Sequence, residues 1–181
     1  MPGELGGWAV VLADMSVFAV LFAVFLVQRA ADPAGFASDR TELDLATGMV
    51  NTLVLLTSSL VVVHGVHAFR TGSRELAGRL FAAGAALGGV FLVIKALEWV
   101  GKFSAGITPM SGEFFLYFFV LTGIHAVHVV LGIGFLLGLR ALSRTRRPRQ
   151  GHVRVVELGG IVWHMVDLLW IILFPLLYLA S

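Results

Sequence analysis

Long apolar stretches separated by short polar segments dominate the pattern of hydrophobic and polar positions along this 181-residue chain. About 20 consecutive, mostly apolar residues are enough for an α-helix to cross the hydrocarbon core of a bilayer. The pattern predicts five membrane-spanning helices, which run approximately over Gly7 to Val27, Ala46 to Phe69, Leu80 to Gly101, Glu113 to Leu139 and Leu158 to Leu179. The predicted fold class is therefore all-α, a polytopic membrane protein built as a bundle of five transmembrane helices.

The segments between the predicted spans are polar and short. None is long enough to fold separately, so residues 1–181 are predicted to form a single transmembrane domain. The first of these linkers, Gln28 to Leu45, contains Pro33 and Gly35 and is interpreted as a loop. The first apolar run has no basic segment before it and no convincing small-residue cleavage site after it, so a removed signal peptide is not expected.

The positive charges are unevenly distributed between the linkers. Three arginines lie between residues 70 and 79 and six between residues 140 and 154, whereas the first linker carries Asp32, Asp39, Glu42 and Asp44. Because positively charged loops stay on the cytoplasmic side, the second and fourth linkers are predicted to face inward, with the N-terminus cytoplasmic and the C-terminus outside. This role in membrane orientation explains the arginines better than nucleic-acid binding does, and no nucleic-acid partner is expected.

Composition narrows the class of protein further. With 58% hydrophobic residues, 13% charged residues and a mean hydropathy of +0.92, the chain does not have the composition of a water-soluble domain. The chain has no cysteine, which excludes disulfides, thiolate metal sites and cysteine nucleophiles. No Walker, Rossmann or HExxH pattern is present.

Ionisable residues inside the apolar runs are the candidates for function, since a central Asp or Lys costs about 3 kcal/mol to insert into a membrane. They are Asp14, His64, His67, Lys95, Glu98, His125, His128, His164 and Asp167. Counting 1.5 Å per residue from the predicted inner ends places four of them roughly 9–18 Å deep. These four are Asp14, His128, His164 and Asp167, and we expect pairing among them across the first, fourth and fifth spans.

The remaining ionisable residues have simpler interpretations. Lys95 and Glu98 are three residues apart near the predicted outer end of the third span, which indicates an interfacial ion pair whose lysine extends to the lipid headgroups. His64 and His67 lie close to the inner end of the second span and are interpreted as interfacial. Small residues of the third and fourth spans, among them the GxxxG motif of Gly134 and Gly138, are expected to allow close approach of helices.

Histidines in a membrane bundle also raise the question of haem or another metal. His125 and His128 are three residues apart, but no third-ligand motif such as Glu-x-x-His accompanies them. No two histidines of one span have the spacing of about four turns that is common in bis-histidine haem stacks. Hydrogen-bonded structural histidines are therefore the preferred interpretation.

Read with their flanking residues, these polar positions resemble the cytochrome c oxidase subunit III family of the haem-copper oxidases. The matching stretches are NTLVLLTSS from Asn51, FFVLTGIHAVHVVLG from Phe118 and WHMVDLLWIILF from Trp163, in the family's order and with similar spacing. The chain looks like the short five-helix form, which lacks the first two helices of the full-length members. Three further stretches look most like the short branch associated with nitric oxide reductases: LADMSVFAVLF from Leu12, EWVGKFSAGIT from Glu98 and HMVDLLWIILFPLLY from His164.

The resemblance assigns family positions to the polar residues of this chain. Asn51 and Thr52 match the start of the helix that follows the family's long outer loop. The remaining matches are Glu98, with the family's glutamate before an aromatic residue, His125 and His128, with its histidine pair, and His164 and Asp167, with its Trp-His-x-x-Asp motif. The family's mid-membrane glutamate, known for its reactivity with carbodiimide, falls at Asp14, whose side chain is one methylene shorter.

The resemblance implies a non-catalytic accessory subunit III without redox centres. It would stabilise the catalytic subunit of a cytochrome c oxidase or a nitric oxide reductase in a bacterial inner membrane and support proton uptake. Haem and copper would belong to that partner, and the expected ligands of this chain are membrane lipids, including a bound phospholipid. Two alternatives remain open: a small b-type cytochrome with histidine haem ligands, drawn from His64, His125, His128 and His164, and an independent proton-coupled transporter.

Overall fold

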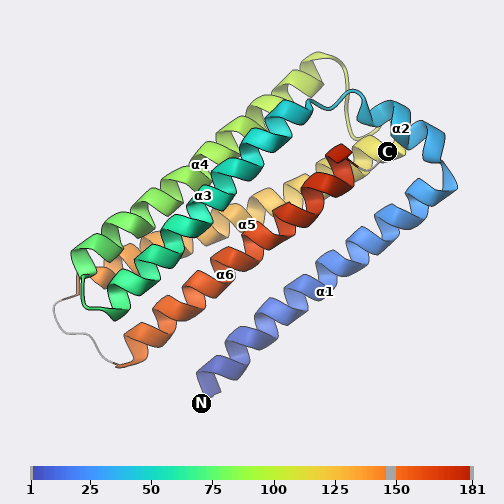
Figure 1. The fold of residues 1–181 in the computed structure, drawn as a ribbon. Helices are drawn as coiled ribbons and strands as arrows, with labels where there is room; N and C mark the ends of the chain where they lie inside the picture. Colours follow the sequence, from blue (N-terminus) through green and yellow to red (C-terminus); the bar gives the residue numbers. More distant parts are fainter. Residues whose placement is uncertain (1, 146–149, 180–181) are drawn as a thin grey trace.

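The computed structural model of the chain describes residues 2–145 and 150–179. Every regular element in these two ranges is helical (Figure 1). The α-helices are α1 (Pro2–Ala31), α2 (Pro33–Arg40), α3 (Leu45–Arg70), α4 (Arg74–Ser104), α5 (Glu113–Ser143) and α6 (Gln150–Phe174), and a π-helical turn, η1 (Pro175–Leu179), continues α6. Five of the helices in the described part of the chain are long and apolar enough to cross a membrane, which confirms the predicted fold class.

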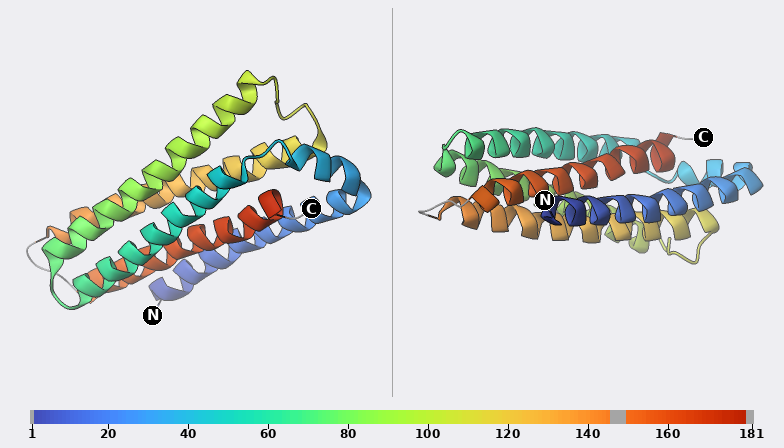
Figure 2. Two further views of the ribbon diagram at one scale, coloured as in Figure 1. Left: turned by 45° about the horizontal axis from the view of Figure 1, so that its top comes forward. Right: turned by 90° about the horizontal axis from the view of Figure 1, so that it is seen from below.

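The long helices run alternately up and down, so that the connections gather at two ends (Figures 1 and 2). The N-terminal end of α1, the α3–α4 turn and the start of α6 lie at one end, with α2, the α4–α5 connection and η1 at the other. Helices α3 to α6 pack side by side as a four-helix bundle, and α1 lies against α5 and α6. The described arginines of the second and fourth linkers therefore share an end with the start of α1, as the charge pattern predicted, while Arg146, Arg147 and Arg149 lie outside the described residues. That this end is cytoplasmic stays a prediction.

Several helix limits differ from the predicted ones. The first linker is not simply a loop, because it contains α2, which has Pro33 at its first turn and Asp32 as N-cap, accepting a hydrogen bond from the Gly35 amide at 3.0 Å. Helix α6 begins at Gln150, eight residues before the predicted start at Leu158. Hydropathy detects only the part of a helix that matches the hydrocarbon core, whereas the helices continue into the polar region beyond it.

Helix α3 begins after the capping residue Asp44, which belongs to the linker that also contains Asp32, Asp39 and Glu42. Asp44 accepts hydrogen bonds from the Ala46 and Thr47 amides, at 3.1 and 3.2 Å, and from the Thr47 hydroxyl at 2.5 Å. These hydrogen bonds, of which the one from the Thr47 side chain has the largest effect, lower the pKa of the Asp44 carboxyl. The pKa of nearby Asp39 is raised, first by partial burial and then by the negative charges of Asp32 and Glu42.

Glycines bring the four central helices close together at particular points. A Cβ at Gly88 of α4 or at Gly132 of α5 would lie 2.7 or 2.8 Å from the ring of Trp163, which fills the space between these helices. The GxxxG glycines behave differently, because a Cβ at Gly134 or Gly138 would meet nothing within 4 Å. The expectation of close approach is therefore wrong for this motif: the helix rotation set by the surrounding packing turns it away from the bundle.

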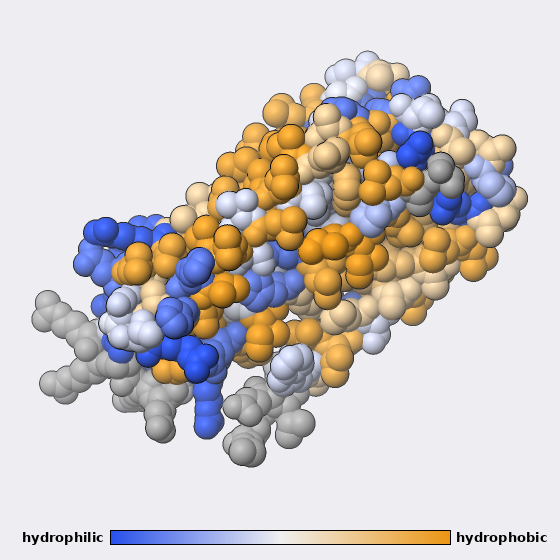
Figure 3. Space-filling view, in the orientation of Figure 1, coloured by the Kyte–Doolittle hydropathy of each residue, from blue (hydrophilic) through white to orange (hydrophobic). Residues whose placement is uncertain are grey.

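The outer surface is suited to lipid rather than water. Hydrophobic side chains cover most of the middle of the face drawn in Figure 3, and hydrophilic ones gather towards the two ends. Helix α1 is the least covered span, since 18% of its most apolar window is buried against 50% for the span that contains α6. A bilayer would solvate this exposed apolar surface.

Candidate functional site

The ionisable residues within the spans form three separate groups, and the first joins α1 to α5. His128 Nε2 lies 2.9 Å from Asp14 Oδ1, and His128 Nδ1 lies 2.8 Å from the carbonyl oxygen of Ile124. Because a carbonyl can only accept, the proton on that side belongs to Nδ1. A single further proton lies between Nε2 and the carboxyl group, so the partly buried Asp14–His128 pair is either an ion pair or a neutral acid and imidazole.

The second group lies between α3 and α6. The Ser59 hydroxyl lies 2.5 Å from His164 Nδ1. The same hydroxyl lies near the Asp167 carboxyl, but neither oxygen of that carboxyl is in hydrogen-bond geometry with any described residue. Asp167 is only 3% exposed.

The expected pairing among the four deep residues is therefore only partly found. Asp14 pairs with His128, whereas His164 turns to a serine of α3, and none of the ion pairs found among the described residues includes Asp167. His164 and Asp167, which are three residues apart, share a face of α6, as their spacing indicated. That face meets α3, and the sequence contained no signal for which neighbour it would meet.

The third group is a buried triad near the end of the bundle that holds α2 and η1, formed by Lys95 and Glu98 of α4 and Tyr178 of η1. Lys95 Nζ donates to Glu98 Oε2 at 2.8 Å and to the Tyr178 hydroxyl at 2.7 Å, and that hydroxyl donates to Glu98 Oε1 at 2.6 Å. The ammonium group also lies 4.8–5.2 Å from the ring centroids of Phe118, Trp170 and Tyr178.

The prediction of a lysine that extends to the headgroups is therefore wrong. Lys95 is 1% exposed, and its amine points into the bundle because α4 turns that face towards α5 and η1. The ion pair with Glu98 that the spacing of three residues predicted is present. Tyr178 was missed because the sequence reasoning considered charged groups and histidines, and the phenol of the last span belongs to neither class.

Two further predicted residues are fully buried and have no hydrogen-bond partner among the described residues. These are Asn51 of α3, at both side-chain polar atoms, and His125 of α5, at both ring nitrogens. The ring of His125 packs between Phe91 and Trp170, with centroid distances of 5.5 and 5.4 Å. Trp170 in turn donates from its indole nitrogen to Thr52 Oγ1 at 3.0 Å, so Thr52 stabilises the aromatic side of this cluster.

These contacts make His125 and His128 poor axial ligands for the b-type cytochrome alternative. An axial ligand needs a free ring nitrogen facing open space, whereas both nitrogens of His128 are engaged and the His125 ring is enclosed by two aromatic rings. Of the other two histidines named for this alternative, His64 is exposed on α3, and His164 is engaged with Ser59 at Nδ1 and lines a cavity. Within the described ranges, no three or more His, Cys, Asp or Glu side chains are grouped so that they could hold a metal ion.

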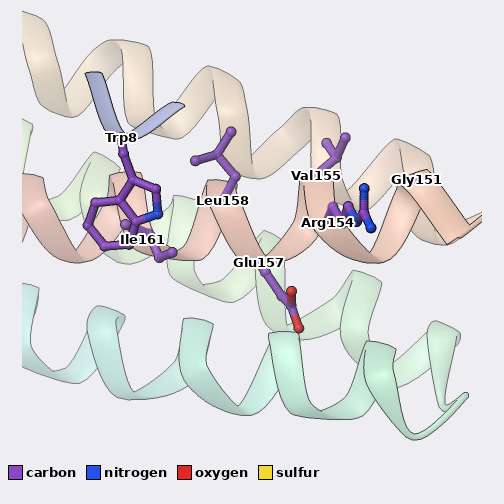
Figure 4. A pocket seen from close by; sticks show the side chains of 7 residues that line it. All are labelled: Trp8, Gly151, Arg154, Val155, Glu157, Leu158 and Ile161. Carbon is purple, nitrogen blue, oxygen red and sulfur yellow. The ribbon is translucent and has the colours of Figure 1, made fainter. Parts of the chain in front are cut away.

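Two neighbouring cavities open on the face formed by α1, α6 and α3. The first, of about 410 Å³, lies between α1 and α6, and Figure 4 shows Trp8 and Ile161 at one end of it and Arg154 towards the other. The second, of about 460 Å³, lies between α3 and α6. Glu157 and Ile161 line both cavities, and Glu157 forms an ion pair with Arg70 of α3 at 3.5 Å.

Comparison with known proteins agrees with the resemblance seen in the motifs. The family model for cytochrome c oxidase subunit III matches residues 9–181. The cytochrome c oxidase subunit 3 of Synechocystis sp. is 36% identical over 172 residues, which cover 93% of this chain and 71% of that protein. The corresponding subunit of Thermostichus vulcanus is 33% identical over 182 residues, 98% of this chain and 87% of that protein. A probable quinol oxidase subunit 3 of Staphylococcus haemolyticus is 32% identical over 180 residues, 98% and 89% of the two chains. With its motifs on the helices of one bundle and a match along almost its whole length, the chain belongs to the cytochrome c oxidase subunit III family.

Proposed function

We propose that the chain is the accessory subunit III of a respiratory haem-copper oxidase in a bacterial inner membrane. In this role it packs against the catalytic subunit, which holds the haem and copper, and stabilises that subunit without a catalytic centre of its own. The match over residues 9–181 to the subunit III family is the observation that carries this proposal. The exposed apolar surface around the bundle offers the catalytic subunit and the lipids an area to contact.

The chemistry of the buried polar groups supports a subunit that carries no electrons. Lys95, Glu98 and Tyr178 form hydrogen bonds with one another, and His128 is paired with one oxygen of Asp14. Groups that are already paired in this way hold helices together, which is a structural role.

The complex is proposed to reduce oxygen, since the relatives described above are named as subunits of cytochrome c and quinol oxidases. A nitric oxide reductase complex is the second candidate. The three stretches from Leu12, Glu98 and His164 that look like the nitric oxide reductase branch favour it.

Support of proton uptake is the finer part of the proposal, and Asp14 is the residue proposed to provide it. Its carboxyl group shares one proton with His128 and is partly exposed beside α1, the least covered span. A carboxyl in this position can take up and release a proton near the catalytic subunit. If Asp14 has this role, the pH–rate profile of the complex changes in Asp14→Asn, and an unaltered profile would remove the role from Asp14.

A bound phospholipid is proposed for the cavity between α1 and α6. Trp8, Leu158 and Ile161 provide an apolar wall for an acyl chain, and Arg154 lies where an anionic headgroup would sit. Native mass spectrometry of the complex tests this: Trp8→Ala should lower the fraction of chains that retain lipid, and equal retention would contradict the site.

The first experiment for the main proposal is a mild-detergent purification of the tagged chain, followed by mass spectrometry and an optical spectrum. We expect a haem-bearing catalytic subunit to co-purify, and the chain separated from it to be colourless. The identity of the partner then decides between an oxidase and a nitric oxide reductase. A chain that elutes alone with its own haem absorption would overturn the accessory role.

A further inference from the structure

Asp167 is a buried carboxyl group that the accessory role leaves without a function. It is 3% exposed, neither oxygen has a hydrogen-bond partner among the described residues, and no ion pair found there includes it. An ionised carboxylate without a partner in a low-dielectric interior is far more costly than the neutral acid. The resting form of Asp167 in this environment is therefore the protonated acid.

A hydroxyl group connects this acid to a histidine. Ser59 Oγ lies 2.5 Å from His164 Nδ1, and the same hydroxyl lies near the Asp167 carboxyl without a hydrogen bond to it. A serine hydroxyl has one donor and two acceptor positions, so it can accept from the imidazole while it donates to the carboxyl. Ser59 thus lies beside both side chains, and a small side-chain movement that brings its hydroxyl into hydrogen-bond geometry with the carboxyl would let it pass a proton between them.

The histidine itself reaches a cavity that opens to the surface. His164 is half-buried and lines the cavity of about 460 Å³ between α3 and α6. The polar side chains of this cavity besides His164 are His67, Arg70 and Glu157, and they come from both helices that form it. A cavity of this size with several polar groups is large enough to hold water molecules. Water can therefore deliver protons to His164 from the end of the bundle where the arginines gather.

We propose that Asp167 is a proton-exchanging acid that is connected to water in this cavity through Ser59 and His164. In the loading direction, a proton from water binds His164 Nε2, His164 Nδ1–H passes its proton to Ser59 Oγ, and the Ser59 hydroxyl passes its own proton to the Asp167 carboxylate. One proton enters, the carboxylate becomes the neutral acid, and the imidazole ends as the neutral Nε2–H tautomer. The ligand of this site is a proton, and the site lies on a different pair of helices from the Asp14–His128 pair.

All groups in this path belong to this chain, so the path can be tested whichever catalytic subunit is attached. The measurement is infrared spectroscopy of the purified complex during a change from H₂O to D₂O, because the C=O stretch of a protonated carboxyl is separate from carboxylate absorption and shifts on deuteration. We expect a carboxylic acid signal that is absent in Asp167→Asn. Its deuteration should be slower by about tenfold or more in Ser59→Ala and in His164→Gln. This is a modest expectation, because a positioned acid–base group usually accelerates proton transfer by a larger factor.

Ser58→Ala is the matched control, since Ser58 is the neighbouring serine of α3 but donates to the Gly84 carbonyl oxygen at 2.9 Å. Deuteration in this variant should proceed at the wild-type rate. Two results would overturn the proposal: the absence of an Asp167 carboxylic acid signal in the wild type, or equal deuteration rates in Ser59→Ala, Ser58→Ala and the wild type. The rate comparison among the serine variants remains decisive even if Asp167→Asn does not fold. The optical spectrum and partner of the same sample report on the accessory role separately.

Discussion

Replacing Lys95 by methionine is the sharpest test of how the buried triad stabilises the bundle. The substitution keeps much of the side-chain volume and removes the ammonium group, which leaves Glu98 buried without its counter-charge while Tyr178 still donates to it. Removing one partner of a buried ion pair typically costs about 3–5 kcal/mol. Because Glu98's side chain is only 5% exposed, water cannot readily replace the lysine. We therefore expect Lys95→Met to lower the free energy of unfolding by about 3 kcal/mol or more.

The double variant Lys95→Met/Glu98→Gln separates the lost attraction from the burial of an unpaired charge. The amide that replaces the carboxylate would retain an oxygen that accepts from Tyr178, and no charge would remain in the triad. We expect most of the stability to return, with a residual loss of about 1–2 kcal/mol from the missing contacts between the ammonium group and the aromatic rings.

The assay is unfolding in mixed detergent micelles by titration with sodium dodecyl sulfate, followed by circular dichroism. Lys102→Met is the matched control, because this lysine of the same helix is less buried and donates to the Glu42 carbonyl oxygen. Its loss should stay within about 1 kcal/mol. A loss of under about 1 kcal/mol in Lys95→Met, or a double variant as unstable as the single one, would refute the reasoning about an unpaired buried charge.

Three further predictions concern packing, a cross-helix pair and a helix cap. Gly88→Ala should destabilise the bundle by about 1–3 kcal/mol because the new methyl group meets a tryptophan ring, whereas Gly89→Ala, which meets nothing within 4 Å, should be neutral or stabilising; equal effects in the unfolding assay would contradict the packing. In a double-mutant cycle of Asp14→Ala and His128→Ala, the unfolding free energies should give a coupling of about 1 kcal/mol, and additive losses would show that the contact between α1 and α5 contributes no stability. Because folding lowers the pKa of Asp44, its stabilising effect is present above the unfolded pKa of about 4 and is lost as the pH falls through the lower, folded value; unfolding followed as a function of pH should therefore show a smaller acid-induced loss in Asp44→Asn than in the wild type, and identical curves would exclude this cap as a source of acid sensitivity.

The residues that carry the family motifs could be identified from the sequence, and so could the pairing of Lys95 with Glu98 and of Asp14 with a histidine of another span, but the other partners could not. A histidine or carboxylate inside an apolar run is visible because lipid penalises it wherever it points. The partner depends on how the helix is rotated about its axis, and this rotation results from packing against several neighbours at once. His164 illustrates the difference: its position in the motif was predictable, and its contact with Ser59 was not.

Lys95 is the residue whose surroundings differ most from the predicted ones. Near the end of a span, a lysine can lie either in the headgroups or in the protein, and the local sequence is the same in both cases. The partner that stabilises the buried position is Tyr178, 83 residues further along the chain. No window of local sequence contains both residues, so their contact could not be read from the pattern around either.

By itself, the sequence determined the five spans, their alternating direction and the family. Each of these follows from local composition or from ordered motifs, because a bilayer accepts any sufficiently apolar helix whatever its neighbours are. Only the tertiary structure decided which faces meet. It buried Lys95 beside Tyr178, directed His164 to Ser59, turned Gly134 and Gly138 away from the bundle, and folded α2 within an expected loop. The physical reason is that close packing and hydrogen bonding inside the bundle act between residues far apart in the chain, after the bilayer has already selected the helices.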